Sequence, residues 1–174
     1  MRSNCTILCR PELLCAWRSL AGVDTMLRLR SADARDGNGI RTLLERNGLP
    51  TEDLGSSHPD FVVAEEGEDL AGAGALERFG TVALLRSVVV ALDRRGSGVG
   101  RRIVRELEQR ARASGVRELV LLTQTAAPFF EHHGYRIVER GKVSPAVQAS
   151  EEFRSICPVS AICMVKTLVE PTTK

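Results

Sequence analysis

The sequence predicts an α/β domain, with a mixed central sheet of about seven strands flanked by helices. Two apolar segments, residues 61–66 and 70–77, are separated by a short polar turn, which is typical of an antiparallel hairpin. An apolar segment at 81–92, an amphipathic segment and a second apolar segment at 118–123 then follow in that order. This order predicts a right-handed βαβ unit whose two strands are parallel. A sheet that contains both kinds of pairing is mixed.

The bulk composition is that of one soluble globular domain. The 174 residues are 43% hydrophobic and 26% charged, and the formal net charge at pH 7 is +2. That charge is too small to indicate a nucleic-acid partner by itself, and no apolar run approaches the roughly 20 residues that span a bilayer. The sequence therefore predicts a cytoplasmic protein with neither nucleic acid nor membrane as a partner.

The number of cysteines and the composition of the N-terminal segment also favour a cytoplasmic protein. An odd number of scattered cysteines is not typical of a disulfide framework, so reduced thiols are expected. Arg10, Glu12 and Arg18 interrupt every apolar run that could serve as a secretory signal. We predict that residues 1–25 are an N-terminal extension, poorly ordered or not native, and that the domain spans 26–170. The five cysteines are Cys5, Cys9, Cys15, Cys157 and Cys163.

The first elements are a strand and a helix. Residues 26–32 alternate apolar and basic side chains, which predicts a half-buried strand. Apolar side chains within 32–49 fall on one face of a helix, which Gly48 is expected to stop. Residues 49–60 contain Pro, Ser, Asp and Gly and predict a loop before the hairpin. The apolar positions of the helix are Ala34, Ile40, Leu43 and Leu44.

The helix of the βαβ unit has the clearest pattern in the chain. Its apolar side chains recur at intervals of three and four residues, so one face is expected in the core. On the polar face Glu106 and Arg110 form a favourable i,i+4 pair. Ser114 and Gly115 end the helix before the strand at 118–123. The apolar positions are Val99, Ile103, Val104, Leu107 and Ala111.

The last third of the chain completes the sheet. A short helix is predicted with Pro128 in its first turn and Gly134 as its C-terminal stop. A strand, a helix and a final strand are expected after it. These four elements are predicted at residues 126–134, 135–140, 144–156 and 160–168.

The segment RRGSGVG, residues 94–100, joins the strand at 81–92 to the helix that follows. Backbone N–H groups at such a turn, together with the positive end of the helix dipole, form an anion site suited to phosphate. A P-loop is excluded because no lysine follows the last glycine. A dinucleotide-binding turn is excluded because the third glycine comes one residue early. The flanking arginines, which raise the local positive potential, are Arg94, Arg95, Arg101 and Arg102.

Two motifs resemble the GCN5-related N-acetyltransferase (GNAT) family. Residues 88–111 are similar to the family's pyrophosphate-binding segment, whose signature Gln/Arg-x-x-Gly-x-Gly/Ala is met by Arg95, Gly98 and Gly100. The later FFEHHGY is similar to the family's Phe-Tyr-x-x-x-Gly-Phe element, and the predicted order of elements is nearly that of the family. The resemblance spans residues 26 to about 168. It implies a single GNAT domain that acts as an N-acetyltransferase with acetyl-coenzyme A as co-substrate.

A narrower resemblance lies in the C-terminal third. LLTQTAAPFFEHHGY and FRSICPVSAICM are similar to the acetyltransferases of bacterial arsenic-resistance gene clusters. This resemblance implies a small toxic amine as the acceptor, such as an arsenic-containing amino acid. A protein or peptide N-acetyltransferase and a catalytically weak acyl-coenzyme A sensor stay open as alternatives, and so does a homodimer.

The family resemblance also implies which residues bind the cofactor. The backbone near Val88 and Val90 would pair with the pantetheine arm as an added strand. Amide groups of the glycine segment would hold the pyrophosphate, and Phe130 would border the cofactor. Arg101 either contacts a phosphate or is a solvated arginine on the helix face. The residues of the glycine segment are Arg95, Gly96, Ser97, Gly98, Val99 and Gly100.

No residue is assigned as a catalytic acid or base. Many relatives carry a tyrosine at the position of Phe130 to protonate the departing thiolate, and phenylalanine has no proton to donate. Tyr135 occupies the last aromatic position of the motif and does not replace it. An uncharged amine can attack the thioester directly if the protein positions both reactants. Through a water molecule, Glu65 or His132 is a candidate to accept the proton of the amine.

Two polar residues are candidates for substrate binding. Arg86 is a lone charge in an apolar strand, so it needs an anionic partner. A structural carboxylate and a carboxylate of the acceptor are both open, and strict alternation places Arg86 on one strand face with Val88 and Val90. Thr123 ends the next parallel strand, where ligands of α/β proteins often bind. Cys157 and Cys163 are too few for a metal site, so no metal is predicted.

Overall fold

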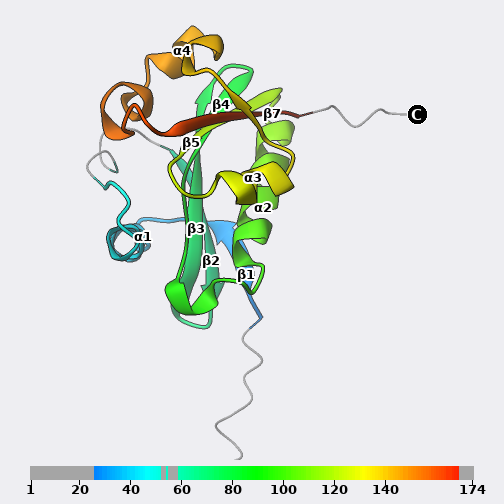
Figure 1. Ribbon diagram of the computed structural model, residues 1–174. Helices are drawn as coiled ribbons and strands as arrows, with labels where there is room; N and C mark the ends of the chain where they lie inside the picture. The colour runs from blue at the N-terminus through cyan, green and yellow to red at the C-terminus, as the bar shows by residue number, and fades with distance from the viewer. Residues whose placement is uncertain (1–25, 52–53, 55–58, 169–174) are drawn as a thin grey trace, which may run out of the picture.

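A computed structural model describes residues 26–51, 54 and 59–168 of the chain (Figure 1). The predicted extension at residues 1–25, with Cys5, Cys9 and Cys15, lies outside the described residues, as do residues 52–53 and 55–58 of the loop predicted at 49–60. The strands are β1 (Arg28–Ser31), β2 (Asp60–Glu66), β3 (Asp69–Phe79), β4 (Val82–Val90), β5 (Glu118–Thr123), β6 (Arg136–Val138) and β7 (Ile162–Thr167). The α-helices are α1 (Gly37–Arg46), α2 (Val99–Ala113), α3 (Ala127–His132) and α4 (Pro145–Gln148).

The strands form a seven-stranded sheet in the order β1-β2-β3-β4-β5-β7-β6, which confirms the predicted mixed sheet. Strands β4 and β5 are parallel, and the other neighbours in this sheet are antiparallel. The parallel pairing runs only from Val82 to Leu84 on β4. Beyond it, β4 continues against β3 and β5 continues against β7, so the two strands part in the middle of the sheet.

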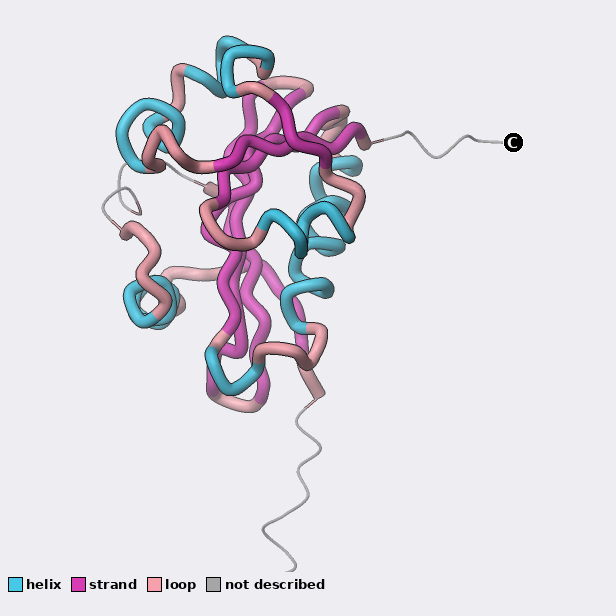
Figure 2. Tube along the Cα trace, in the orientation of Figure 1, coloured by secondary structure: helices cyan, strands magenta, loops and turns pink. Residues whose placement is uncertain are grey.

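Helices cover both faces of the sheet (Figures 1 and 2). One face carries α2 and α3, whose buried side chains share one core cluster that includes Ile103, Leu107 and Phe130. The other face carries α1 over β2, β3 and β4, and α4 over β4, β5 and β7. The two parting strands are therefore flanked by different helices on the two faces.

Close packing of α2 depends on glycines in β3. A β-carbon at Gly72 would lie 2.7 Å from Ile103 Cδ1 and 2.8 Å from the backbone oxygen of Val89. One at Gly74 would lie 2.9 Å from atoms of both Ile103 and Leu107. The absence of side chains on this strand lets the apolar face of α2 lie directly on the sheet.

A β-bulge in β4 reverses which way its side chains point. Ala75 pairs with Arg86 and Ala73 with Val89, so β4 contains one more residue than β3 over this stretch. Ser87, within the bulge, has a φ of 54°. Val89 consequently faces α1 and Arg86 lies on the same sheet face, whereas Val88 faces α2 and lies 3.4 Å from the β-carbon position of Gly74.

The bulge makes one sequence prediction wrong. Arg86 does not share a strand face with Val88 and Val90, because strict alternation does not hold across an extra residue. Two further elements differ from expectation. Ala34 is exposed and precedes α1, and the helix predicted at 144–156 is interrupted between α4 and a π-helical turn, Glu152–Ile156.

We predict that Gly72→Ala lowers the free energy of unfolding by about 2 kcal/mol, because the added methyl group overpacks the interface between β3 and α2. Urea denaturation monitored by circular dichroism measures this change. Gly141→Ala is the matched control, since its β-carbon position has no atom within 4 Å. Equal unfolding free energies of the two variants would show that α2 can shift without loss.

Candidate functional site

The glycine segment forms the link between the end of β4 and the start of α2. Gly96 and Gly98 have φ values of 79° and 87°, in the left-handed region that favours glycine. Gly98 is the N-cap of α2 and supplies no capping side chain. Within the described part of the chain, the N–H groups of Gly98, Val99 and Gly100 have no hydrogen-bond partner. These free N–H groups at the positive end of a 15-residue helix form a site for an anion.

Gly100 lies within ordinary van der Waals contact distance of two neighbouring side chains. A β-carbon there would lie 3.4 Å from Val90 Cγ2 and 3.5 Å from Phe129 Cζ. The loop, the end of β4 and the ring of Phe129 therefore meet at this point. Together they border the gap that opens between β4 and β5.

The two phenylalanines of α3 have different surroundings. Phe130 is only 6% exposed and packs edge-on against Phe129 and Tyr135, with ring centroids 5.0 and 5.4 Å apart. The family resemblance implies that Phe130 borders the cofactor. In the structure Phe130 belongs to the core cluster, whereas the half-buried Phe129 packs against that cluster and lies toward Gly100.

The arginines around the loop also differ from one another. Arg94 donates to Glu66 Oε2 at 2.6 Å, and Arg95 donates to the side-chain oxygen of Asn47, so these two hold the loop to β2 and to the end of α1. Arg102 donates to the backbone oxygen of Leu27 at 2.9 Å. Arg101 has no partner among the described residues, and its Nη2 lies 3.6 Å from the β-carbon position of Gly98. Arg101 is thus placed to contact an anion on the loop.

The two parting strands offer backbone groups that are not paired between β4 and β5. After Leu84, β4 has no pairing with β5, and this stretch includes the half-buried Val88 and Val90. An extended polar chain can hydrogen-bond there as an additional strand. Thr123 ends β5, and its hydroxyl oxygen accepts the N–H of Ala126 at 3.0 Å. Thr123 therefore shapes the turn into α3, besides any role in binding.

Arg86 lies on the opposite face of β4 and already has carboxylate partners. Its side chain is 4% exposed; Nη1 lies 3.2 Å from Glu77 Oε2, and Nη2 lies 2.9 Å from Glu152 Oε2. The other oxygen of Glu152 accepts a hydrogen bond from the Cys157 thiol at 2.9 Å. The structural carboxylate that the sequence analysis gave as one alternative is thus present, from β3 and from the segment before β7. Neither Glu77 nor Glu152 was identified from the sequence.

The two described cysteines and Tyr135 are held protonated by their surroundings. Burial, reinforced by Glu152, raises the pKa of Cys157 to about 12, and burial raises that of Cys163 to about 11. Burial, and then Glu108, raises the pKa of Tyr135 well above its usual value. Glu65 is bound by Arg30 at 2.7 Å, on the side of β2 next to β1. His132 is exposed at the end of α3.

Within the described ranges, neither a metal-binding cluster nor a membrane-spanning helix is found. No cluster of three or more His, Cys, Asp or Glu side chains is placed to bind a metal ion there. Among the helices of those ranges, none has the length and apolar character needed to cross a membrane.

Comparison with known proteins finds similarity to acetyltransferases. Residues 57–137 match the family model described as acetyltransferase (GNAT) domain. The chain is 34% identical over 80 residues to the uncharacterized N-acetyltransferase YjcF of Bacillus subtilis, over 45% of this chain and 57% of that protein. It is 46% identical over 56 residues to N-alpha-acetyltransferase 80 of Mus musculus, over 32% of this chain and 18% of that protein. The matches thus cover less than two thirds of either relative.

A solved structure has the same fold. Rv2747 from Mycobacterium tuberculosis, in complex with CoA and NLQ, superimposes with a TM-score of 0.69 and 24% sequence identity. The superposition covers 82% of this chain and 99% of that one. The described residues therefore share the fold of that structure, and residues 57–137 match the GNAT acetyltransferase family model.

Proposed function

We propose that this chain transfers the acetyl group of acetyl-coenzyme A to the amine of a small molecule. The observation that carries the proposal is the glycine loop, whose free N–H groups lie at the start of α2 beside the gap between β4 and β5. A nucleotide phosphate needs such an anion site, and a thioester-bearing arm needs an adjacent extended channel. The CoA in the complex of Rv2747 supports this assignment.

The cofactor contacts follow from that geometry. The loop from Arg95 to Gly100 would bind the pyrophosphate through its amides, because a side chain at Gly98 would meet the ligand. Arg101 would contact a phosphate. The backbone around Val88 and Val90 would pair with the pantetheine arm, and Phe129 would line its path.

The chain's contribution to the reaction would be positioning and charge stabilisation. A neutral amine attacks the thioester carbon, and backbone N–H groups fixed at the gap would stabilise the oxygen that becomes negative. The thiolate of coenzyme A is a good leaving group. Phe130 has no proton to give, and Tyr135 is buried with a raised pKa. The proposal therefore includes no side-chain acid.

The proposal also includes the class of amine that accepts the acetyl group. The resemblance of residues 121–135 and 153–164 to arsenic-resistance acetyltransferases favours a toxic amine such as an arsenic-containing amino acid. The similarity to N-alpha-acetyltransferase 80 favours the second candidate, the N-terminus of a peptide. A cytoplasmic location agrees with all of these acceptors.

We predict that Gly98→Val weakens acetyl-coenzyme A binding at least tenfold, about 1.4 kcal/mol, in isothermal titration calorimetry. The branched side chain would occupy the anion site and strain a positive φ. Gly115→Val is the matched control, because Gly115 lies just beyond the other end of α2 and has a φ of 78° with no atom near its β-carbon position. Equal losses in both variants would assign the effect to strain and remove the loop from the cofactor site.

Arg101→Ala is expected to reduce the same affinity by about tenfold at low salt and by less at high salt, since the lost contact is an ion pair. Arg105→Ala, one turn further along the exposed face of α2, serves as the control. If both variants bind as the unchanged chain does, Arg101 is only a solvated arginine.

Release of coenzyme A tests the activity itself. Free thiol is measured with a panel of small amino acids, amine-bearing arsenicals and short peptides as acceptors. We expect turnover with a small amine. Turnover with peptides alone would establish the second candidate, and acetyl-coenzyme A binding without turnover by any acceptor would identify a sensor.

A further inference from the structure

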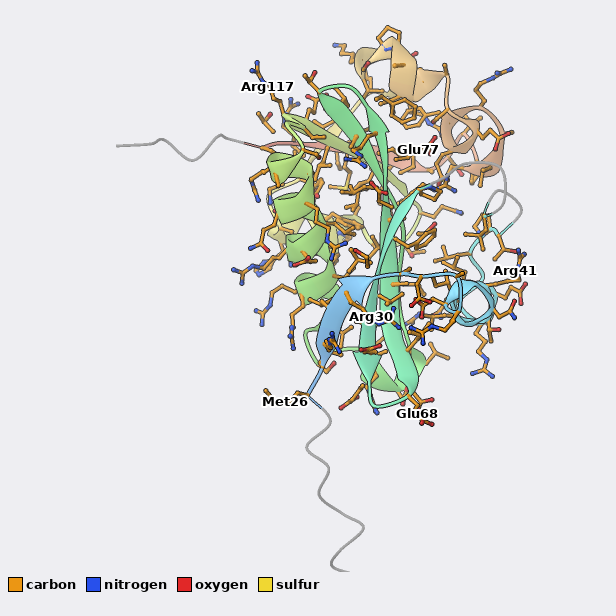
Figure 3. The ribbon with its side chains drawn as sticks, turned by 180° about the vertical axis from the view of Figure 1, so that it is seen from behind. Met26, Arg30, Arg41, Glu68, Glu77 and Arg117 are labelled. Atoms are coloured by element: carbon orange, nitrogen blue, oxygen red, sulfur yellow. The ribbon has the colours of Figure 1, made fainter. Side chains whose placement is uncertain are left out.

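A carboxylate that has no assigned role lies at the level where β4 and β5 part. Glu77, on β3, pairs with Leu84, which is also the last residue of β4 paired with β5. Its side chain lies on the sheet face opposite α2, since Leu84 belongs to the core cluster of Val147 on α4. Figure 3 shows Glu77 between α1 and the segment that contains α4.

The surroundings of Glu77 hold one oxygen and leave the other available. Oε2 lies 3.2 Å from Arg86 Nη1, and the arginine is in turn held by Glu152. Oε1 has no hydrogen-bond partner within the described residues, and the Glu77 side chain is 21% exposed. A fixed carboxylate with a free, solvent-accessible oxygen can accept a proton and pass it to water.

Glu152 is less suited to this role. It is 12% exposed, one oxygen accepts from Arg86, and the other accepts from Cys157. Arg140 is a further charged group near this cluster, and its guanidinium donates to the backbone oxygens of Cys157 and Pro158. Two carboxylates thus share the guanidinium of Arg86.

We propose that Glu77 is the general base of the reaction, with Arg86 and Glu152 as positioning residues; this inference rests on the proposed function. The acceptor arrives as an ammonium ion, and one N–H proton moves to Glu77 Oε1. The nitrogen lone pair then forms the N–C bond to the acetyl carbon. The C–S bond breaks, and its electron pair leaves on the sulfur of coenzyme A. The second proton lost by the nitrogen goes to solvent or to the thiolate.

The same arrangement defines the class of acceptor. Since Arg86 is already paired with two carboxylates, it does not offer a free cation to an acidic substrate. The free oxygen of Glu77 instead attracts a cation. The acceptor is therefore an amine that is protonated at neutral pH and does not depend on a carboxylate for binding.

The test compares Glu77→Gln with Glu118→Gln. Glu118 is a partly buried glutamate on the same sheet face, where β4 and β5 are still paired. Methylamine, protonated at pH 7, and hydroxylamine, neutral there, are the two acceptors. We expect Glu77→Gln to lower kcat/KM for methylamine about 10²-fold at pH 7, with a deficit that shrinks as pH rises. Hydroxylamine should be much less affected, and Glu118→Gln should match the unchanged chain.

A melting curve and the acetyl-coenzyme A Kd of each variant separate catalysis from folding. If Glu77→Gln does not fold, Glu77→Asp keeps the charge but withdraws the oxygens, and a smaller deficit with the same pH dependence is expected. A deficit that is equal for both amines and constant with pH would overturn the role of Glu77 and leave the acetyltransferase proposal intact. Absence of turnover in the unchanged chain would instead refute the proposed function.

Discussion

The short parallel contact between β4 and β5 is the constraint on which the rest of the site depends. Pairing stops after Leu84 and Val120, although both strands continue. Each strand keeps its other neighbour, since β3 still pairs with β4 and β7 with β5. The sheet can therefore open in its interior without losing the hydrogen bonds of its outer strands. Backbone groups at such an opening need partners, which makes it suited to an extended ligand.

Helix α2 links the stability of the fold to the anion site. Its apolar face is buried on the glycines of β3, and its buried Glu108 accepts a hydrogen bond from Lys166 of β7 at 2.7 Å. A buried ion pair of this kind fixes position more than it adds stability. Because the helix is held along its length on both sides of the gap, its N-terminus is fixed beside the end of β4. The free N–H groups of the glycine loop are thereby preorganised.

The two faces of the opening have different chemical character. The α2 face offers backbone, glycines and Arg101, which suit a long ligand with phosphates. The opposite face offers the cluster of Glu77, Arg86 and Glu152 between α1 and α4. The bulge at Ser87 separates these functions, because it turns Arg86 away from Val88 and Val90. A donor and an acceptor can thus approach one gap from two sides.

The order of the elements, the parallel pair and the glycine loop were predictable from local sequence. Period-two and period-3.6 patterns depend on neighbouring residues, and the motif of Arg95, Gly98 and Gly100 is contiguous. The buried face of α2 and the Glu106–Arg110 pair were confirmed for the same reason. What only the tertiary structure decided involves residues far apart in the chain. The bulge depends on the register against β3, the different surroundings of Phe129 and Phe130 depend on how α3 packs, and the partners of Arg86 come from two distant segments. One extra residue or a small rotation reverses such contacts, and neither leaves a local signal.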